Sequence, residues 1–446
     1  MVHFARLGKE CDNMINILSS SMDNFMSVLK IINYIMLSLL PLIYIPQFFY
    51  SIVSLLYKPK TYKNSKKKHS FGYIICAHNE GNVIGKLIES IQKQNYQKKL
   101  MHIFVVCDNC TDNTYEVAKN LGCYVIERND TSKIGKCYAL DCGIKHIKQN
   151  YSHLGIDAFF IFDADNLVTR EYTMVMNNLY STGCKVATSY RNSHNFKDNA
   201  FTSSSAITFF RECEIVHRAR NVCGLSTYVS GTGFYVDSKL LFSFDGWPFE
   251  TLVEDIEFSI YCANNNIKIG YAYDAIFYDE QTDNLKDTFN QRMRWCKGNH
   301  QNFFKYFGSM IKSTFKNKNL SSIDMIFHTT PTPAFSIIWT FIYTLILAVV
   351  AIVTKASFSE FIASGVDDIL FYYLFLYLGG LMQSSLSVFN GYKRIDCNRF
   401  KLILYVLIFP VYLIWFIFIL AITLFVPVRW KKISHKNEKN IEDLEV

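Results

Sequence analysis

Long uncharged hydrophobic runs lie towards the two ends of the chain. Residues 31–57 contain no charged side chain over 27 positions, and similar runs occupy residues 334–354, 369–389 and 402–428. A bilayer core about 30 Å thick requires roughly 20 apolar residues of helix, so each run is long enough to span it. The first run is too long for a signal peptide and lacks a cleavage-site pattern. The pattern therefore predicts four membrane spans.

Between these runs, short apolar stretches alternate with amphipathic ones. Stretches typical of buried strands occupy residues 71–77, 102–107, 123–128 and 157–162. The stretch after the first of them has the spacing of a helix with one apolar stripe, formed by Val83, Ile84, Leu87, Ile88 and Ile91. The next helix is predicted to begin near Thr111 and Asp112 and to stop at Gly122. Strands that alternate with helices predict a mostly parallel sheet with right-handed crossovers.

The positive charge of the chain is concentrated beside the first hydrophobic run. The formal net charge is +8, and six lysines lie between Lys58 and Lys68, directly after that run. Such a cluster marks the cytoplasmic side of a span and attracts anionic lipid. Residues 70–330 are then predicted to be cytosolic. A nucleic-acid partner is not expected, because no helix-turn-helix, finger or RNA-binding signature accompanies the lysines.

The thirteen cysteines are interpreted as small apolar side chains in a reducing compartment. Cys107 and Cys110 have the spacing of a zinc-binding pair, but a second pair at ligand spacing is missing. A zinc site is therefore not expected.

Candidate chemistry begins where the apolar run "FFIFDADNLV" (159–168) meets two carboxylates, Asp163 and Asp165. Asp and Asn often open a turn after a strand, which is the structural alternative. In parallel sheets, however, ligands bind outside the carboxyl ends of the strands, and residues 78–80 and Asp108 follow two other predicted strands. Because three strands bring polar groups to one edge, a site for a hard divalent cation is favoured.

No glycine-rich phosphate loop accompanies these acids. The first strand-to-helix turn, "CAHNEGNVIG" (76–85), lacks G-x-G-x-x-G, and G-x-x-x-x-G-K-[ST] is absent from the chain. A phosphate-bearing ligand would instead need a cation and basic side chains. Lys136 and either Arg292 or Arg294 are the candidates for that positive charge.

Six motifs, in this order, resemble the membrane-integrated family 2 glycosyltransferases, which include cellulose, hyaluronan, chitin-oligosaccharide and poly-N-acetylglucosamine synthases. They are "CAHNE" (76–80), "VVCDNCTDNT" (105–114), "GKCYAL" (135–140), "DADN" (163–166), "VEDIEFS" (253–259) and "QRMRW" (291–295). The resemblance covers roughly residues 70–305 by motif and the flanking spans by general layout.

The resemblance implies roles on the donor side of the site. Asp108 matches the residue that contacts the uracil or ribose of the donor, and Lys136 matches a lysine near its diphosphate. Asp163 and Asp165 match the D-x-D metal motif of the family. These residues would bind a nucleotide sugar together with Mg2+ or Mn2+.

Other roles concern the catalytic base and the acceptor. Asp255 matches the proposed general base, beside Glu254. Gln291, Arg294 and Trp295 match the Q-x-x-R-W motif at the donor phosphates and the acceptor sugar. Chemistry agrees with these roles, because a carboxylate accepts the proton of a hydroxyl and an indole presents a flat apolar face to a pyranose.

The chain departs from the family pattern at Val253, where many polymer synthases have Thr, which puts a particular polymer in doubt. The segment "VSGTGFYV" (229–236) resembles the loop that shapes the acceptor site. Taken alone, it is equally a glycine turn between strands.

The expected fold class is α/β, a GT-A type nucleotide-sugar-binding domain with a mostly parallel sheet, flanked by transmembrane α-helices. The expected segments are an N-terminal segment with the first span (1–57), a cytosolic transferase domain (58–304), an amphipathic basic segment at the membrane surface (305–330), C-terminal spans (331–428) and a charged tail (429–446).

The resemblance implies an inverting enzyme of the cell membrane that uses a nucleotide sugar, UDP-linked, to build a β-linked polysaccharide. One alternative is transfer of a single sugar to a lipid-linked acceptor, such as a polyprenyl phosphate or a glycolipid. Another is a membrane scaffold or channel with a degenerate transferase domain. The donor sugar, the linkage and any partner subunit stay open.

Membrane topology also stays open at the sequence level. Three spans after a cytosolic domain would put the basic tail (429–440) outside, against the positive-inside rule. Either the tail violates the rule, or one hydrophobic segment does not cross. Pro410 and the Gly379–Gly380 pair leave room for a bent or re-entrant segment.

Overall fold

The computed structural model describes residues 2–355, 357–429 and 439–444. The chain divides into two compact units. One consists of Met1–Ile45 and Thr332–Tyr377, and the other of Pro46–Pro331 and Leu378–Val446. The second unit contains the whole of the sheet described below.

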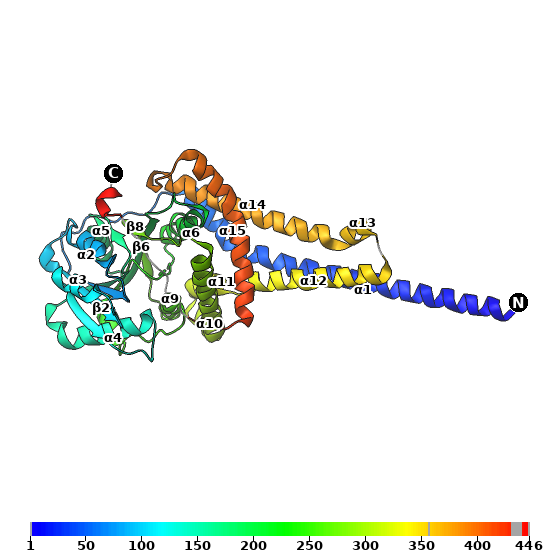
Figure 1. Ribbon diagram of the computed structural model, residues 1–446, viewed down its shortest axis with the longest axis horizontal. Helices are drawn as coiled ribbons and strands as arrows, with labels where there is room; N and C mark the ends of the chain where they lie inside the picture. Colours follow the sequence, from blue (N-terminus) through cyan, green and yellow to red (C-terminus); the bar gives the residue numbers. More distant parts are fainter. Residues whose placement is uncertain (1, 356, 430–438, 445–446) are drawn as a thin grey trace. The chain divides into compact units, whose positions relative to one another are not determined.

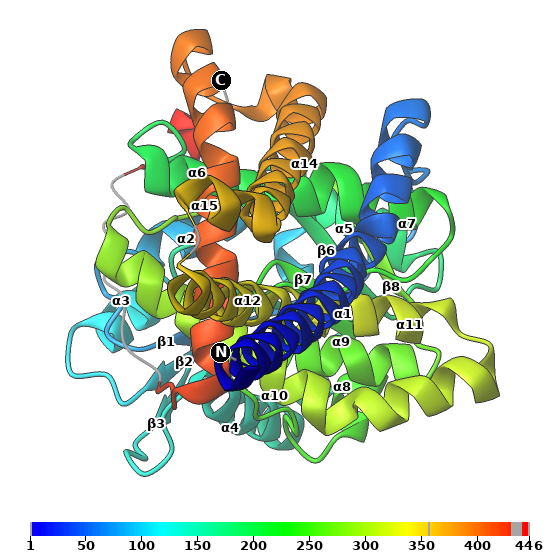
Figure 2. The same cartoon turned by 90° about the vertical axis from the view of Figure 1, so that its right-hand side faces the viewer.

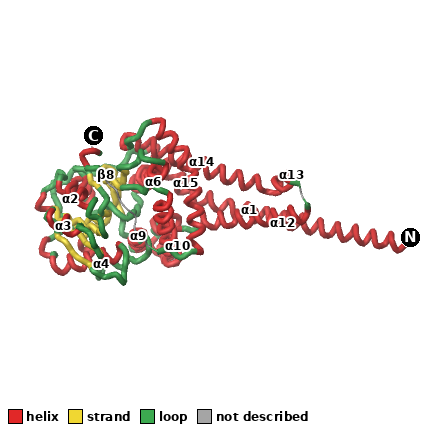
Figure 3. Tube along the Cα trace, in the orientation of Figure 1, coloured by secondary structure: helices red, strands yellow, loops and turns green. Residues whose placement is uncertain are grey.

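Eight strands of the described residues form one sheet (Figures 1 and 3). Their order in the sheet is β3-β2-β1-β4-β7-β6-β8-β5. They are β1 (Phe71–Ala77), β2 (Met101–Asp108), β3 (Tyr124–Arg128), β4 (Ala158–Asp163), β5 (Leu167–Val168), β6 (Val186–Ser193), β7 (Phe234–Asp237) and β8 (Ile269–Asp279). The strands β3, β2, β1 and β4 run parallel to one another, and β6 runs parallel to β8. β7 runs antiparallel to β4 and β6, and β5 runs antiparallel to β8.

Helices cover both faces of this sheet. The helices of the second unit are α2 (Ile84–Gln92), α3 (Thr114–Asn120), α4 (Lys136–Asn150), α5 (Tyr172–Tyr180), α6 (Ala200–Arg211), α7 (Arg218–Val222), α8 (Ser238–Ser243), α9 (Glu254–Asn264), α10 (Leu285–Asn317), α11 (Leu320–Thr329) and α15 (Arg399–Phe425). In β1, Tyr73 and Ile75 pack with α2, α3 and α5, whereas Ile74 packs with α4 and α9. This alternation follows from the two-residue period of a strand.

The predicted strands and the apolar helical stripe are confirmed. All five residues of the stripe in and before α2 are buried, with 2% exposure or less. Gly122 has φ 78°, a left-handed conformation that ends α3 and that glycine adopts without a Cβ penalty.

The described residues include four helices that are long and apolar enough to cross a membrane, as predicted: Ser20–Leu56, Leu320–Thr354, Asp367–Arg394 and Arg399–Phe425. They involve α1 (Val2–Leu56), α11, α12 (Thr332–Thr354), α14 (Asp367–Gly391) and α15. A short α13 (Phe358–Phe361) precedes α14. In the first unit, α12 runs beside α1 (Figure 1), and the indole of Trp339 donates a hydrogen bond to Asn33 at 3.1 Å.

The last hydrophobic helix, α15, packs lengthwise on helices of the second unit. It lies beside α6 and α10 (Figure 2). Polar groups of α10 reach it at two points: Lys297 Nζ donates to the carbonyl oxygen of Thr423 at 3.0 Å, and His300 Nε2 lies 2.9 Å from that of Leu420. Pro410 of α15 packs against Gly380, where an added Cβ would lie 3.2 Å from Pro410 Cα.

Candidate active site

Asp163, the last residue of β4, forms an ion pair with Lys136. Lys136 is the first residue of α4 and also donates to the carbonyl oxygen of Gly231 at 2.7 Å. Burial lowers the pKa of the Lys136 ammonium, but Asp163 and Glu254 more than offset this, so its pKa is raised and the side chain is a cation. The sheet edge therefore holds a fixed positive charge beside the first acid of D-x-D.

The second acid, Asp165, belongs to a buried polar network. Asn166 donates to Asp165 at 3.2 Å and to Asp279, the last residue of β8, at 2.9 Å. Arg191 of β6 forms an ion pair with Asp279, and its Nε donates to that carboxylate at 2.9 Å. Because Asn166 bridges the two acids, the ends of β4 and β8 deliver their carboxylates to one place.

Carboxylates crowd this region enough to perturb one another. Burial raises the pKa of Asp279 to about 6, Arg191 opposes the rise, and the charges on Asp165 and Asp163 add to it. Among the described residues, no three His, Cys, Asp or Glu side chains lie close enough together to enclose a metal ion. The acids nevertheless fit Mg2+ or Mn2+, because such ions commonly take one or two carboxylates and complete their shell with substrate phosphates and water.

Asp108, at the end of β2, is held by Arg128, at the end of neighbouring β3. Arg128 donates to the Asp108 carboxylate at 2.5 Å and to Asp130 at 3.0 Å. His78 Nδ1 lies 2.6 Å from the backbone oxygen of Asp108. The ends of β1 and β2 thus meet at the sheet edge, as the sequence predicts, and Asp108 is fixed there with 6% exposure.

Glu254 and Asp255 begin α9 and lie near Lys136, beside the strand end that carries Asp163. An added Cβ on Gly231 would lie 3.7 Å from Asp255 Oδ2, so the acid lies next to the loop that Lys136 contacts. Burial raises the pKa of Glu254 to about 7, Asp255 adds to the rise, and Lys136 and Arg294 oppose it. Burial also raises the pKa of Asp255. A carboxylate with a raised pKa near neutrality is suited to accept a proton.

α10 forms hydrogen bonds with the loop that precedes these acids. Arg294 donates to the carbonyl oxygen of Leu252 at 2.9 Å, and Asn302 donates to that of Val253 at 3.2 Å. Gly298 allows the close approach, because a Cβ there would lie 2.6 Å from a methyl group of Val253. Val253, the departure from the family pattern, therefore fills an apolar contact between α9 and α10.

The structure distinguishes the two arginines that the sequence left open. Arg294 donates to the loop before α9, and its charge opposes the rise in the pKa of both acids. Arg292 is 1% exposed and turns the other way: its Nε donates to the Tyr412 hydroxyl at 2.7 Å and its guanidinium lies 4.1 Å from the Trp295 ring centre. Arg294 is thus the member of the pair beside the candidate site.

Trp295 and Gln291 are the other residues of "QRMRW" (291–295) with an expected role, and both are partly buried. Trp295 packs edge-on against Phe209, with ring centres 5.9 Å apart, and carries Arg292 over one face. The side-chain oxygen of Gln291 is buried and has no hydrogen-bond partner among the residues that the structure describes. An unpaired buried oxygen is costly, so a ligand that donates to Gln291 would be stabilised.

Four residues of this region were missed by the sequence reasoning: Arg128, Arg191, Glu212 and Asp279. Asp279 follows the apolar run "AIFY" (275–278) as Asp163 follows its own, so the same signal would have found it. Glu212 begins a π-helical turn (Glu212–His217), accepts from Ser230 at 3.1 Å, and has a pKa raised by burial. Nothing in its sequence context distinguishes it.

The family described as "Glycosyltransferase like family 2" matches residues 69–298, just over half of the chain. "Probable glycosyltransferase YdaM" of Bacillus subtilis (strain 168) is 23% identical over 262 residues, 57% of this chain and 61% of that protein. "Poly-beta-1,6-N-acetyl-D-glucosamine synthase" of Staphylococcus aureus (strain MSSA476) is 22% identical over 54% of this chain and 57% of its own length. The match thus spans about three fifths of the length of these relatives.

A mannosyltransferase from Pyrobaculum calidifontis, solved with GDP-Man and Mn2+, resembles the chain in structure. The TM-score is 0.52 at 14% identity, over 82% of this chain and 97% of that protein. This likeness concerns the fold alone and confirms the GT-A type arrangement of sheet and helices expected from the sequence.

Proposed function

Because the chain belongs to the glycosyltransferase-like family 2, we propose that it is an inverting membrane glycosyltransferase that builds a β-linked polysaccharide from a nucleotide sugar. The observation that carries this proposal is the convergence of two groups at one sheet edge. D-x-D with its cationic partner Lys136 lies beside an acid pair whose pKa values are raised, Glu254 and Asp255.

The donor side is assigned to the ends of the parallel strands. Asp108 would bind the nucleoside, and Lys136 and Arg294 would bind the diphosphate. Asp163 and Asp165 would hold Mg2+ or Mn2+, which supplies Lewis-acid stabilisation of the leaving phosphate when bound. The two cationic side chains would stabilise the same developing negative charge from fixed positions, so little reorganisation is needed during the reaction.

The acceptor side is assigned to the first turn of α9. Asp255 would take the proton of the acceptor hydroxyl while that oxygen forms a bond to the anomeric carbon. The bond between the anomeric carbon and the phosphate oxygen breaks on the opposite face, and the nucleoside diphosphate leaves. Glu254 would set the proton affinity of Asp255 by its own protonation, since neighbouring carboxylates titrate as a pair.

A polymeric product is supported by the relative named as a poly-β-1,6-N-acetylglucosamine synthase and by the four apolar helices. An enzyme that extends a chain must hold the product end while the next donor enters. Trp295 would serve this purpose, because an indole face retains a sugar by apolar contact. UDP is the proposed nucleotide, on the resemblance of the motif around Asp108.

We further propose that the catalytic domain is cytosolic and that the tail lies on the same side. Glu442 forms an ion pair with Lys93 at 3.0 Å, Tyr278 donates to the carbonyl oxygen of Leu444 at 3.3 Å, and Ile441 is 3% exposed. A tail that packs on the catalytic domain requires an even number of crossings between them. α15 packs along α6 and α10. It is the segment that would lie at the membrane surface instead of crossing the membrane. Both basic segments are then cytoplasmic, in accord with the positive-inside rule.

The sidedness is tested in sealed vesicles with a protease. An epitope placed after Val446 and the lysine segment 58–68 should be cleaved, or protected, together. Opposite accessibility of the two would refute an even number of crossings.

The function is tested by incubating the purified full chain with a panel of labelled nucleotide sugars and either cation, and by sizing the products. A ladder or a high-mass polymer from one donor supports the proposal. A singly glycosylated, organic-extractable lipid would instead establish transfer to a lipid acceptor. Absence of both transfer and donor hydrolysis across the panel would favour a scaffold with a degenerate domain.

A further inference from the structure

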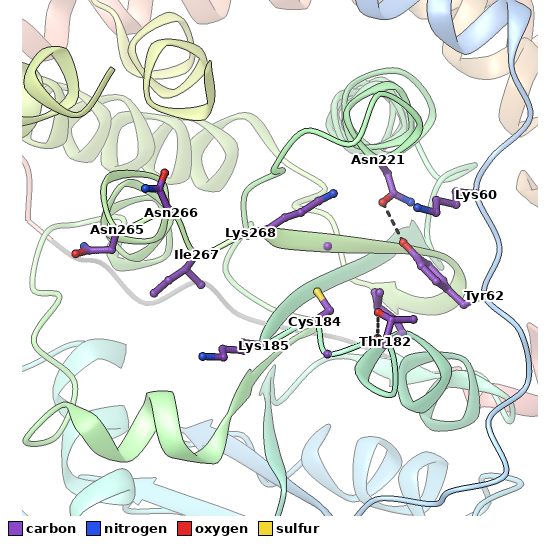
Figure 4. Close-up of a pocket in the computed structure, with 13 residues that line it drawn as sticks. Lys60, Tyr62, Thr182, Cys184, Lys185, Asn221, Asn265, Asn266, Ile267 and Lys268 are labelled. Carbon is purple, nitrogen blue, oxygen red and sulfur yellow. Dashed lines mark hydrogen bonds between the residues drawn. The ribbon is translucent and has the colours of Figure 1, made fainter. Parts of the chain in front are cut away.

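A cavity lies at the amino-terminal ends of β6 and β8, opposite the strand ends that carry the candidate active site. Its volume is about 490 Å3, and its walls come from the linker after α1, the turn between α5 and β6, the end of α7 and the turn between α9 and β8 (Figure 4). It meets the sheet at Lys185 and Lys268, which precede β6 and β8. Strands rise about 3.3 Å per residue, so the eight residues of β6 put roughly 25 Å between this cavity and the acids.

The charged residues that line the cavity are all cations. Lys60, Lys185 and Lys268 line it together with three asparagines, and its lining contains no Asp or Glu. Figure 4 shows the side chains of Lys60 and Lys268 extending toward one another around Asn221. None of these three lysines forms an ion pair with the part of the chain that the structure describes. Lys185 extends away from these two, and all three lysines are exposed to solvent. An anion bound between Lys60 and Lys268 would be attracted by both ammonium groups.

The walls of the cavity are held by hydrogen bonds. The Tyr62 hydroxyl donates to Asn221 at 3.0 Å, and the Asn221 amide donates to the carbonyl oxygen of Tyr271 at 3.0 Å. On the other side, Asn319 donates to Asn266 at 2.8 Å. The linker that carries Lys60 is therefore anchored to β8 through Tyr62, so this lysine has a defined place in the wall.

The cavity is close to the point where the first candidate span ends. Lys60 comes four residues after Leu56, the last residue of α1. Arg218 donates to the carbonyl oxygen of Tyr57 at 2.8 Å and begins α7, whose residue Asn221 lines the cavity. Lysines near a membrane surface attract anionic lipid, and lysine binds phosphate as a point charge.

We propose that this cavity is a binding site for a phosphate-bearing anion, separate from the donor site. The chemistry is shared by the headgroup of an anionic phospholipid and by a soluble phosphate. Either would neutralise the lysines and accept hydrogen bonds from the asparagine amides. A ligand there would join the linker after α1 to the starts of β6 and β8.

The experiment compares two triple variants of the full chain in neutral detergent. Lys60→Gln, Lys185→Gln and Lys268→Gln together remove the cavity charges. Lys98→Gln, Lys99→Gln and Lys239→Gln remove the same net charge from exposed positions outside the cavity and outside the lysine cluster 58–68. Native mass spectrometry measures binding of phosphatidylglycerol against phosphatidylcholine with the same acyl chains, and calorimetry measures binding of pyrophosphate. Thermal unfolding of each variant verifies folding.

The affinity for phosphatidylglycerol or for pyrophosphate should fall at least about ten-fold in the cavity variant and stay within about two-fold in the control. Loss for phosphatidylglycerol identifies a lipid headgroup, and loss for pyrophosphate alone identifies a soluble ligand. Equal losses in both variants, or no loss in either, would overturn the proposal. If the cavity variant does not fold, Lys268→Glu against Lys239→Glu makes the same comparison.

Discussion

Replacement of Asp255 by Asn tests the assignment of the base most directly. Asn keeps the shape of the side chain but accepts no proton, so turnover at saturating donor should fall by about 10²- to 10⁴-fold. At about 1.4 kcal/mol per factor of ten, this adds about 3–5.5 kcal/mol to the barrier. Donor affinity should be retained, because Lys136 and the D-x-D acids are untouched.

The pH dependence of the rate gives a second, independent readout. A base acts only when deprotonated, so activity is present above the pKa of the acid pair and is lost as pH falls through it. Burial raises the pKa of Glu254 to about 7, so at about pH 6 roughly a tenth of this group is deprotonated. Asp255 adds to that rise. In Asp255→Asn one neighbouring negative charge is gone, so the pKa of Glu254 falls and the acid limb of the residual activity moves to lower pH.

The assay is release of nucleoside diphosphate, measured from about pH 5 to about pH 9. Glu257→Gln is the matched control, because Glu257 is a buried acid of the same helix whose carboxylate accepts from Lys305 at 2.7 Å and Tyr306 at 2.6 Å, both of α10. Its acid limb should stay in place. The reasoning is refuted if Asp255→Asn keeps its turnover and loses donor affinity, or if its acid limb does not move.

Three further changes have defined outcomes. Asp165→Asn should abolish transfer, and chelators should inhibit the parent until Mn2+ or Mg2+ is restored; full activity of the variant in excess chelator would exclude the metal. Arg191→Met leaves Asp279 buried without its cation and should destabilise the protein by about 3–5 kcal/mol, which a lower thermal unfolding midpoint in detergent would show. Lys197 forms an exposed ion pair with Asp396, so Lys197→Met should change stability by less than about 1 kcal/mol. Trp295→Ala should shorten the products and leave slow donor hydrolysis, so products of full length would remove Trp295 from product binding.

Local sequence pattern was sufficient for the strands β1 to β4 and for the end of the sheet where the candidate site lies, but it did not predict β5 to β8. The strands β1 to β4 are continuous apolar runs because helices cover both faces of this part of the sheet, so successive side chains are buried on either face. A polar residue directly after such a run lies at the carboxyl end of a strand, which is why Asp108, Asp163 and Asp165 were found. Uncharged runs of more than 20 residues likewise predicted the four long helices, since only their length and composition are needed.

Contacts between distant segments were decided only by the tertiary structure. Arg191 and Asp279 meet across β6 and β8, 88 residues apart in sequence, and no local period encodes such a pair. The choice between Arg292 and Arg294 depended on the face that α10 turns toward α9, and hence on the contact between Gly298 and Val253. The cavity brings together Lys60, Lys185 and Lys268 from three separate segments. In the sequence, each of these residues is an ordinary solvated lysine. Hydrophobic periodicity reports which face of an element is buried, but the partner on that face is chosen by packing of the whole chain, so these sites required the fold.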